Sequence, residues 1–413
     1  MNWKYLLSFS YSIIMKAKRR IGHHVKLFIN DSRSVGIVLL VSTTASLVIS
    51  NFWLGNKWLN FWETEMPFFH RLQIPHSYLH IINDGLMAVF FMLAGMEIKR
   101  ELLDGELSSA QKAALPATAA LGGMLIPALI FSFFNKGSDA MSGWAIPAST
   151  DIAFSLGVAS LLGNRVPVSL KIFLTALAII DDLGAIVIIA CFYGDPVKLW
   201  FLLAALIVIG GILFFNRRLK KFGLIQFILG ILLWWLVYHS GIHATVAGVI
   251  FAFLVPRSML SKLEHWLHRP VYFIIMPLFA LANTAILFPD DLDGSLMTNL
   301  SWGIILGLFI GKPLGIYLSA YFLVKQKKAV LPNGVNWPQL LGAGILAGIG
   351  FTMSIFISSL AFKEKGSIDT AKIAVLAGSF LSMIGGYFCL KYFSGKPVTT
   401  MDEEDPERMR DIE

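Results

Sequence analysis

One stretch, residues 172–192, constrains the fold of this chain more than any other. It reads IFLTALAIIDDLGAIVIIACF and is apolar except for Thr175 and the adjacent acids Asp181 and Asp182. A helix of this length is about 30 Å long, which matches the hydrocarbon thickness of a bilayer. The two acids fall at its middle, where one charge costs roughly 2.5–3.5 kcal/mol on insertion scales. We therefore predict a continuous membrane helix whose paired acids bind a cation or protons.

The composition also predicts a membrane protein. Of 413 residues, 56% are hydrophobic and 15% are charged, whereas about 25% are charged in soluble domains. The net charge of +8 raises the question of nucleic acid, but no basic face carries interleaved aromatic residues, so we expect no nucleic-acid partner. Cys191 and Cys389 lie inside apolar runs, so no disulfide or metal framework is predicted.

The apolar runs predict an all-α polytopic protein in the lipid bilayer. We expect a cytoplasmic amphipathic arm over 1–33, one transmembrane domain over 34–394 and a disordered acidic tail over 395–413. The domain should hold about twelve transmembrane helices. Their expected ranges are 34–53, 79–98, 113–134, 144–162, 172–192, 197–215, 223–239, 241–256, 270–288, 302–323, 338–361 and 370–394.

Positive residues predict the orientation of these helices. If the amino terminus is cytoplasmic, most Lys and Arg residues fall in cytoplasmic connections, as the positive-inside rule requires. The run NRRLKK at 216–221 is the clearest marker, and the lysines at 363 and 365 are the exception. Both termini are therefore expected to face the cytoplasm.

Two of the twelve ranges are poor continuous helices. The fourth contains Pro147, which removes a donor, followed by Ser149, Thr150 and Asp151, which suit a helix start. The eleventh has four glycines in its first half, at 342, 344, 348 and 350. Broken helices at membrane depth are tolerated only where protein or water satisfies the freed backbone. We predict that helices 3–5 and 10–12 are inverted repeats with crossing broken helices 4 and 11.

Crossed broken helices have an electrostatic consequence. Two helix amino ends would face each other, as would two carboxyl ends, and each end carries about half a charge. Asp151 would offset the amino ends, and Lys312, in the middle of the tenth helix, would offset the carboxyl ends. The alternatives are an ordinary N-cap for Asp151, which is compatible with this role, and a snorkelling lysine for Lys312.

Several motifs resemble one known family. INDGLMAVFF at 82–91, STDIAF at 149–154, AIIDDLGAI at 178–186, HATVAGV at 243–249 and AGIGFTMSIFI at 347–357 resemble signatures of the NhaA family of sodium/proton antiporters. EIKREL at 97–102 and GKPLGI at 311–316 do so too, and the similarity extends from about residue 26 to 390. Inverted repeats are already known from this family. Residues 283–285, Asn-Thr-Ala, depart from its usual Asn-Ala-Gly.

The resemblance implies a transporter, not an enzyme, with no cofactor. Asp181 and Asp182 would form the exchange site, with Thr150 and Asp151 at the crossing and Lys312 completing the charge balance. Na⁺ would bind at Asp182, Asp181 and Thr150. The expected activity is electrogenic export of Na⁺ or Li⁺ for protons, two protons per Na⁺, across the bacterial inner membrane. It would regulate intracellular pH and sodium.

A second cluster is expected at the cytoplasmic mouth. The resemblance implies a pH-sensing role for six residues, and the alternative is a solvated loop with mixed charges. The six are Glu97, Arg100, Glu101, Glu264, His265 and His268. Elsewhere, Asp84 is expected to be an N-cap and His243 a structural histidine. The resemblance also implies that the 53–76 connection, rich in Trp and Phe, forms a β-hairpin through which two subunits pair.

Other classes of protein fit less well. A passive cation channel would not need a matched lysine or two broken inverted helices. An intramembrane aspartyl protease needs carboxylates on separate helices, and a prenyltransferase needs a DDxxD spacing that DDLGA lacks. A sodium-coupled symporter of related architecture is the closest alternative. Proton coupling without an organic substrate would distinguish the antiporter from it.

Overall fold

The computed structural model describes residues 33–67, 74, 76–219, 222–289 and 291–394. The predicted amino-terminal arm, apart from Arg33, and the predicted tail lie outside these residues. Within the described ranges the chain is helical and has no β-strand, and one isolated antiparallel bridge joins Glu65 and Ser77. The predicted all-α class is confirmed for this part of the chain.

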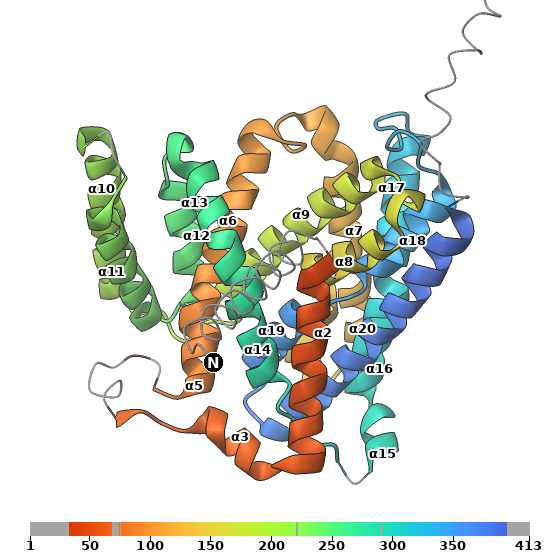
Figure 1. Ribbon diagram of the computed structural model, residues 1–413, viewed down its shortest axis with the longest axis horizontal. Helices are drawn as coiled ribbons and strands as arrows, with labels where there is room; N and C mark the ends of the chain where they lie inside the picture. The colour runs from red at the N-terminus through yellow and green to blue at the C-terminus, as the bar shows by residue number, and fades with distance from the viewer. Residues whose placement is uncertain (1–32, 68–73, 75, 220–221, 290, 395–413) are drawn as a thin grey trace, which may run out of the picture.

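The helices follow one another with short connections (Figure 1). The first group comprises α2 Arg33–Val48, η1 Ile49–Trp53, α3 Asn56–Glu63, α5 Tyr78–His80, η2 Ile81–Leu86, α6 Met87–Asp104, α7 Ala110–Phe134, η3 Asp139–Gly143, η4 Ile146–Ala148, α8 Ile152–Leu161, η5 Gly163–Arg165, α9 Val168–Phe192 and α10 Leu199–Leu219. The second comprises α11 Leu224–Ser240, α12 Thr245–Leu254, α13 Arg257–Pro270, η6 Val271–Ile275, α14 Met276–Asn283, α15 Leu292–Leu296, α16 Asn299–Leu306, η7 Gly307–Gly311, α17 Lys312–Lys325, α18 Trp337–Ala347, α19 Phe351–Ala361 and α20 Lys365–Phe393.

Many of these helices are suited to a bilayer. Seven in the described part are long and apolar enough to span one, and α18 with α19 forms an eighth candidate that is bent by 44°. Three shorter apolar helices, α8, α11 and α12, accompany them. The chain is therefore a polytopic membrane protein. The number twelve and the inverted-repeat relationship stay predictions.

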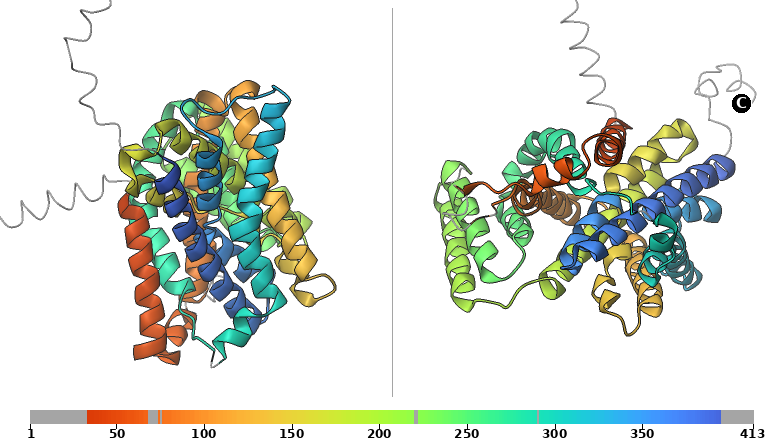
Figure 2. Two further views of the ribbon diagram at one scale, coloured as in Figure 1. Left: turned by 90° about the vertical axis from the view of Figure 1, so that its right-hand side faces the viewer. Right: turned by 90° about the horizontal axis from the view of Figure 1, so that it is seen from below.

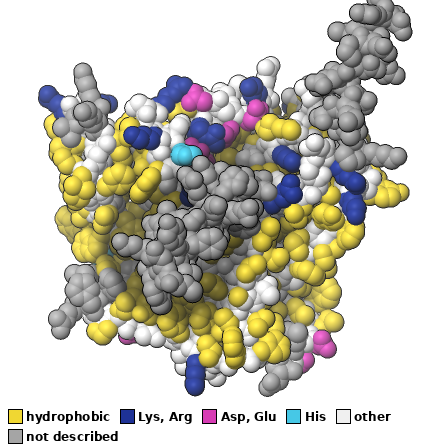
Figure 3. Space-filling view, viewed as in Figure 1, with side chains coloured by type: hydrophobic (Ala, Val, Ile, Leu, Met, Phe, Trp, Pro, Cys, Tyr) yellow, Lys and Arg dark blue, Asp and Glu magenta, His cyan; other side chains and the backbone are white. Residues whose placement is uncertain are grey.

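The helices stand roughly side by side, with α3 and α15 at one end of the molecule and α10 and α13 extending to the other (Figure 1). We call the first of these the α3 end. The pair α10 and α11 forms one flank, and α12 lies between it and α6, which the view from below in Figure 2 also shows. On the face in Figure 3, hydrophobic side chains form a broad band, and most visible Lys and Arg side chains lie toward the end opposite α3.

Small residues allow the closest helix contacts. A Cβ at Gly248 on α12 would lie 2.0 Å from the carbonyl oxygen of Ala88 on α6. A Cβ at Gly315 on α17 would lie 2.0 Å from the carbonyl oxygen of Gly122 on α7. Such small residues let backbones approach closely where the hydrophobic effect does not drive helices together. These contacts fix α6 and α17, which both carry residues of the candidate site.

Two local predictions differ from the structure. Asn56–Glu63 is a helix and not a strand; an isolated bridge follows it, and 68–73 and 75 lie outside the described residues. The predicted hairpin is therefore wrong for the helical part.

The N-cap of the next helix is Ser77, whose hydroxyl accepts from the N–H of His80. Asp84 lies beyond this start, within η2, so its predicted N-cap role is wrong because Ser77 already caps the helix.

Candidate functional site

The helix α9 holds the paired acids at its centre, and it runs without a break as predicted. Asp181 is fully buried and Asp182 is 4% exposed. Adjacent residues on a helix point in directions about 100° apart, so the two carboxyl groups face different neighbours. Asp181 faces α17 and the segment before α8, and Asp182 faces a cavity bordered by α6.

Asp181 forms a buried ion pair with Lys312, the first residue of α17. Lys312 Nζ lies 2.8 Å from Asp181 Oδ2 and also donates to the carbonyl oxygen of Ala148 at 2.5 Å. Thr150 Oγ1 lies 2.6 Å from the same Asp181 oxygen and 2.9 Å from the carbonyl oxygen of Ala347. Lys312 therefore does not snorkel, because its ammonium group is held among buried acceptors.

Two interrupted helices meet beside this pair. Ser149–Asp151 is extended between η4 and α8, and residues 348–350 separate α18 from α19. The Asp151 N–H donates to the carbonyl oxygen of Ile349 at 2.7 Å. The hydroxyl of Ser155 donates to the carbonyl oxygen of Leu346 at 2.8 Å. Backbone groups that one interruption leaves without a helical partner therefore find hydrogen-bond partners at the other interruption. Interrupted helices at membrane depth are tolerated only where such partners exist.

Asp151 caps both helices that begin at these breaks. Its Oδ1 accepts from the Phe154 N–H at 3.1 Å in the first turn of α8, and its Oδ2 accepts from the Thr352 N–H at 3.2 Å in the first turn of α19. The Thr352 hydroxyl also donates to Oδ2. One carboxylate therefore faces two positive helix ends, so the N-cap and electrostatic roles of Asp151 coincide.

A small cavity, which we call the site cavity, adjoins Asp182. The centre of a water molecule can occupy about 10 Å³ of it, which is space for one water-sized occupant. Its polar lining includes Asp182, Thr150, Glu97 and Tyr272. Asp181 Oδ1 and Asp182 Oδ1 are buried and have no hydrogen-bond partner among the described residues. Such oxygens can accept a proton or bind a cation.

The six residues of the second cluster occupy three settings. Arg100 Nε lies 3.2 Å from Glu264, and Arg100 Nη1 lies 3.1 Å from Glu101, so these three are joined. Glu97 lines the site cavity instead. His265 and His268 lie on the exposed side of α13, and the His268 ring contacts the Tyr272 ring with centroids 4.5 Å apart. The part of the cluster on α13 therefore lies on a helix and not in a loop, and Leu260, Leu263 and Leu267 bury the opposite face of that helix.

On α13, Glu264 and His268 have shifted pKa values. Partial burial raises the pKa of Glu264, although the adjacent Arg100 opposes this shift. Loss of water around the ring lowers the pKa of His268, and the positive charges of His265 and Arg269 lower it further. Both shifts favour the neutral forms.

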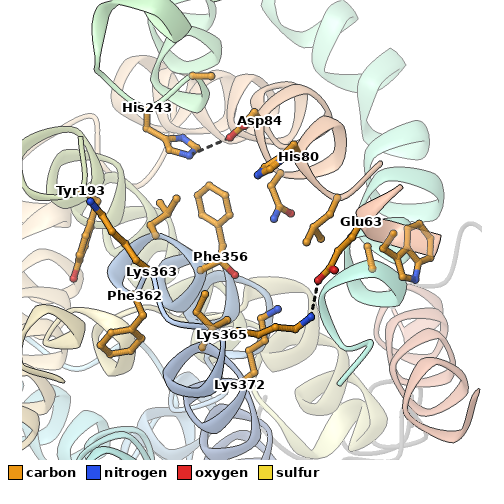
Figure 4. A pocket seen from close by; sticks show the side chains of 18 of the residues that line it. Glu63, His80, Asp84, Tyr193, His243, Phe356, Phe362, Lys363, Lys365 and Lys372 are labelled. Carbon is orange, nitrogen blue, oxygen red and sulfur yellow. Dashed lines mark hydrogen bonds and ion pairs between the residues drawn. The ribbon is translucent and has the colours of Figure 1, made fainter. Parts of the chain in front are cut away.

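Sequence reasoning missed Thr352 and a large cavity at the α3 end. Thr352 lies in the GFTMSIF motif, and its position two residues after Gly350 could have indicated a helix start. The cavity, which we call the vestibule, has a volume of about 700 Å³. His243 Nε2 lies 3.3 Å from Asp84 Oδ1 on one side of it, and Lys365 Nζ lies 2.7 Å from Glu63 Oε1 on another (Figure 4).

The fold and the site together define a membrane protein with a buried acid–lysine site at two interrupted helices, the kind of arrangement found in secondary transporters. A family profile described as Na⁺/H⁺ antiporter 1 matches residues 26–390. The chain belongs to this family, which confirms the resemblance drawn from its motifs. No group of three or more His, Cys, Asp or Glu residues in the described ranges could hold a resident metal ion.

Curated relatives cover nearly the whole chain. A protein of Cytophaga hutchinsonii named Na(+)/H(+) antiporter NhaA is 45% identical over 380 residues, which are 91% of this chain and 96% of that protein. A protein of Flavobacterium psychrophilum with the same name is 47% identical over 374 residues, 89% of this chain and 95% of its own length. A third, from Shewanella sediminis, is 47% identical over 380 residues, covering 89% and 94%.

Proposed function

We propose that the protein is a Na⁺/H⁺ antiporter in which Asp181 and Asp182 are occupied in turn by Na⁺ or by protons. The observation that carries the proposal is the unpartnered Oδ1 atom of each buried carboxyl group. Two ionised carboxylates in an apolar environment are unfavourable unless charge or hydrogen bonds compensate them. Lys312 can compensate one of them, so the pair needs a further cation or protons.

Na⁺ is a hard cation that prefers oxygen ligands. Asp182 and Thr150 supply carboxylate and hydroxyl oxygens at the site cavity, which has room for one water-sized occupant. Asp181 supplies a further carboxylate next to it, because its Oδ2 lies 2.6 Å from Thr150 Oγ1. Li⁺ is smaller and equally hard, so we expect the same oxygens to bind it. The limited space favours one cation at a time, and therefore competition between a metal ion and protons.

The Thr150 hydroxyl indicates where one proton is held. It has a single proton, yet its oxygen lies within hydrogen-bond distance of both Asp181 Oδ2 and the Ala347 carbonyl oxygen. A protonated Asp181 would donate to Thr150, whose own proton would then go to Ala347. When Na⁺ engages Asp181 instead, the hydrogen-bond partner left to Lys312 among the described residues is the Ala148 carbonyl oxygen. The protonation state of Asp181 and the contacts of Lys312 therefore change together when Na⁺ replaces a proton.

The exchange moves net charge. A doubly protonated acid pair is neutral, whereas a doubly ionised pair with one Na⁺ carries a charge of −1. Exchange of two protons for one Na⁺ would then respond to the membrane potential by about 2.3 kcal/mol per 100 mV for each charge moved. In the bacterial inner membrane, with both termini cytoplasmic, inward proton movement would expel Na⁺ and so regulate intracellular pH and sodium.

The sodium-coupled symporter is the weaker candidate. The relatives that match the chain carry the name Na(+)/H(+) antiporter. The site cavity also has no room for an organic substrate.

Pairing of two subunits through the 53–76 connection stays a prediction. In the structure this connection contains the helix α3 and the isolated bridge after it.

Inverted membrane vesicles loaded with a pH-sensitive dye provide the test. Respiration acidifies the interior, and addition of Na⁺ should release protons and restore the fluorescence in the parent protein. Asp182→Asn should abolish this response, because a neutral amide cannot exchange a proton for a cation. Asp139→Asn is the matched control, since Asp139 is exposed in η3 and should leave the response intact.

Two results would contradict the proposal. A Na⁺ response of parental size in both Asp181→Asn and Asp182→Asn would show that the acids do not exchange the ions. Na⁺ uptake into proteoliposomes at a rate that does not depend on the proton gradient would exclude antiport altogether.

Electrogenicity is tested separately. A potassium diffusion potential is imposed across the membrane, and the exchange rate is measured with and without it.

A further inference from the structure

Tyr272 lines the site cavity but is not one of the oxygen ligands of the proposed exchange. It borders this cavity together with Asp182, Glu97 and Thr150. Its ring is partly exposed and contacts the ring of His268, with centroids 4.5 Å apart. His268 itself is exposed on α13. Tyr272 therefore connects the site cavity with the exposed side of α13.

The backbone that carries Tyr272 is irregular. Pro270 is the last residue of α13, and because it has no N–H it cannot donate a helical hydrogen bond. The chain continues as the π-helical segment η6, in which the Met276 N–H donates to the Val271 carbonyl oxygen. Such π-helical turns are rare and frequently lie at functional sites. This turn packs against α6, the helix of Glu97, and so places Tyr272 at the site cavity.

The hydroxyl of Tyr272 lies among carboxyl groups. Four of them are close enough to act on it electrostatically, in decreasing strength Glu97, Asp182, Asp151 and Glu264. Glu97 and Glu264 belong to the second cluster, whereas Asp182 belongs to the exchange site. A tyrosine hydroxyl is neutral at neutral pH, and its oxygen both donates and accepts hydrogen bonds. It can therefore pass on a proton and remain uncharged.

We propose that Tyr272 is a proton relay between the second cluster and Asp182. The inference rests on the proposed function, because it concerns how protons reach the exchange site. The phenol oxygen accepts a proton from Glu97, while the phenol's own proton passes through one water molecule in the site cavity to an oxygen of Asp182. One O–H bond forms at Tyr272 and one breaks, so the phenol stays neutral. Glu97 becomes a carboxylate, which takes a new proton from solvent, and Asp182 becomes a carboxylic acid.

The size of the site cavity couples this relay to the metal ion. The cavity has space for one water-sized occupant. A water molecule in it joins the phenol of Tyr272 to Asp182, whereas Na⁺ in the same place displaces that water and interrupts the relay. Delivery of a proton to Asp182 and binding of Na⁺ therefore exclude each other.

Tyr272→Phe tests the relay, because it removes the hydroxyl and keeps the ring that contacts His268. The purified protein is reconstituted into proteoliposomes, and two rates are measured at saturating Na⁺ and alkaline pH, where protons are scarce. One is Na⁺/H⁺ exchange, followed with a pH-sensitive dye. The other is exchange of radioactive Na⁺ for unlabelled Na⁺ at equal pH on both sides, which needs the ion site and its movement but transfers no proton. Tyr272→Phe should slow the first rate and leave the second unchanged.

The expected loss is moderate. A positioned side chain accelerates proton transfer by about 10²–10⁴-fold, and water in the vacated space would recover part of this, so Na⁺/H⁺ exchange should slow by about tenfold. The Na⁺ concentration that gives half the maximal rate should stay the same, because the phenol is not a ligand of the ion. Tyr387→Phe is the matched control, since Tyr387 on α20 is also partly exposed and lines neither the site cavity nor the vestibule.

The relay is rejected if Tyr272→Phe exchanges Na⁺ for protons at the parental rate. It is also rejected if both rates fall together, since the hydroxyl would then support the fold or the movement of the site. A higher half-saturating Na⁺ concentration with an unchanged maximal rate would make the phenol an ion ligand instead of a relay. Failure of the proposed function is distinguishable from these results, because the parent protein itself would then exchange Na⁺ for Na⁺ and move no protons.

Discussion

Lys312 Nζ lies 2.8 Å from Asp181 Oδ2, and neither side chain has any exposed surface. The two residues come from helices far apart in the sequence, so their contact depends on the whole fold. A buried pair adds little net stability compared with apolar residues of similar volume, but removal of one partner leaves an uncompensated charge. The pair is therefore a sensitive point for both stability and function.

Lys312→Met should lower the free energy of unfolding by about 3–5 kcal/mol, because Asp181 would remain buried without its partner. The double variant Asp181→Asn/Lys312→Met should recover much of this loss, since no unpaired charge remains. Thermal unfolding of the purified protein in detergent, followed by tryptophan fluorescence, measures both. Lys325→Met is the control, because Lys325 is exposed on the same helix α17.

A double variant that is as unstable as the sum of the single variants would contradict this account. It would mean that Asp181 and Lys312 contribute independently, and that the 2.8 Å contact has no energetic coupling.

The double cap at Asp151 makes a second prediction. Asp151→Ala removes acceptors from the first turns of both α8 and α19. Because loss of one N-cap costs about 0.5–2 kcal/mol, we expect about twice that here. Thr352→Val keeps the backbone N–H and removes only the hydroxyl bond, so its effect should be smaller. Unfolding of the two single variants and of the double variant forms a cycle that measures the coupling.

An additive cycle would show that Thr352 and Asp151 act separately, contrary to the geometry. Transport offers an independent readout. We expect Asp151→Ala to reduce Na⁺/H⁺ exchange more than Thr352→Val does, because it frees two helix ends beside the ion site.

Local sequence patterns predict much of this site. The apolar run around Asp181 and Asp182 predicts a continuous helix, and α9 is one. Pro147 and the acid at 151 predict an interrupted helix with an N-cap, and the structure has both. These features follow from hydropathy, missing donors and capping side chains, each of which acts over a few residues.

The rest depends on contacts that no local pattern contains. The second partner of Asp151 is Thr352, 201 residues further along the chain. Asp84 was expected to be an N-cap because it is acidic and near a helix start. The structure places it seven residues after the N-cap Ser77, about two turns into the helix, where it faces His243 from a distant loop.

The shifted pKa of His268 predicts a pH dependence of stability. Its pKa is lowered in the folded protein, so the unfolded state binds more protons near and below pH 6.5. Stability should therefore fall as the pH falls through 6.5 toward the folded-state pKa. His268→Gln should remove this part of the dependence. His265→Gln should weaken it, because the charge of His265 contributes to the shift. Thermal unfolding between pH 5 and pH 8 provides the measurement.

Variants on the helix α13 also test the pH-sensing hypothesis. We expect His265→Ala/His268→Ala to move the midpoint of the pH profile of Na⁺/H⁺ exchange, because α13 contacts α6 through the Arg100–Glu264 pair. An unmoved midpoint would favour the alternative of a solvated face. His239→Ala on α11 is a suitable control, since His239 lies outside this cluster.

The contact between α6 and α12 gives a prediction about assembly of the fold. A Cβ at Gly248 would lie 2.0 Å from the Ala88 carbonyl oxygen, so Gly248→Ala must push the two helices apart. Overpacking of this kind costs typically 1–3 kcal/mol, and here the obstacle is backbone that cannot rotate away. Gly210→Ala is the matched control, because a Cβ at Gly210 on α10 meets nothing within 4 Å and alanine favours a helix. Thermal unfolding should show a loss for Gly248→Ala and no loss for Gly210→Ala. Since α6 also carries Glu97, which lines the site cavity, a shift of this helix should slow exchange as well. Equal stability of the two variants would contradict the close approach.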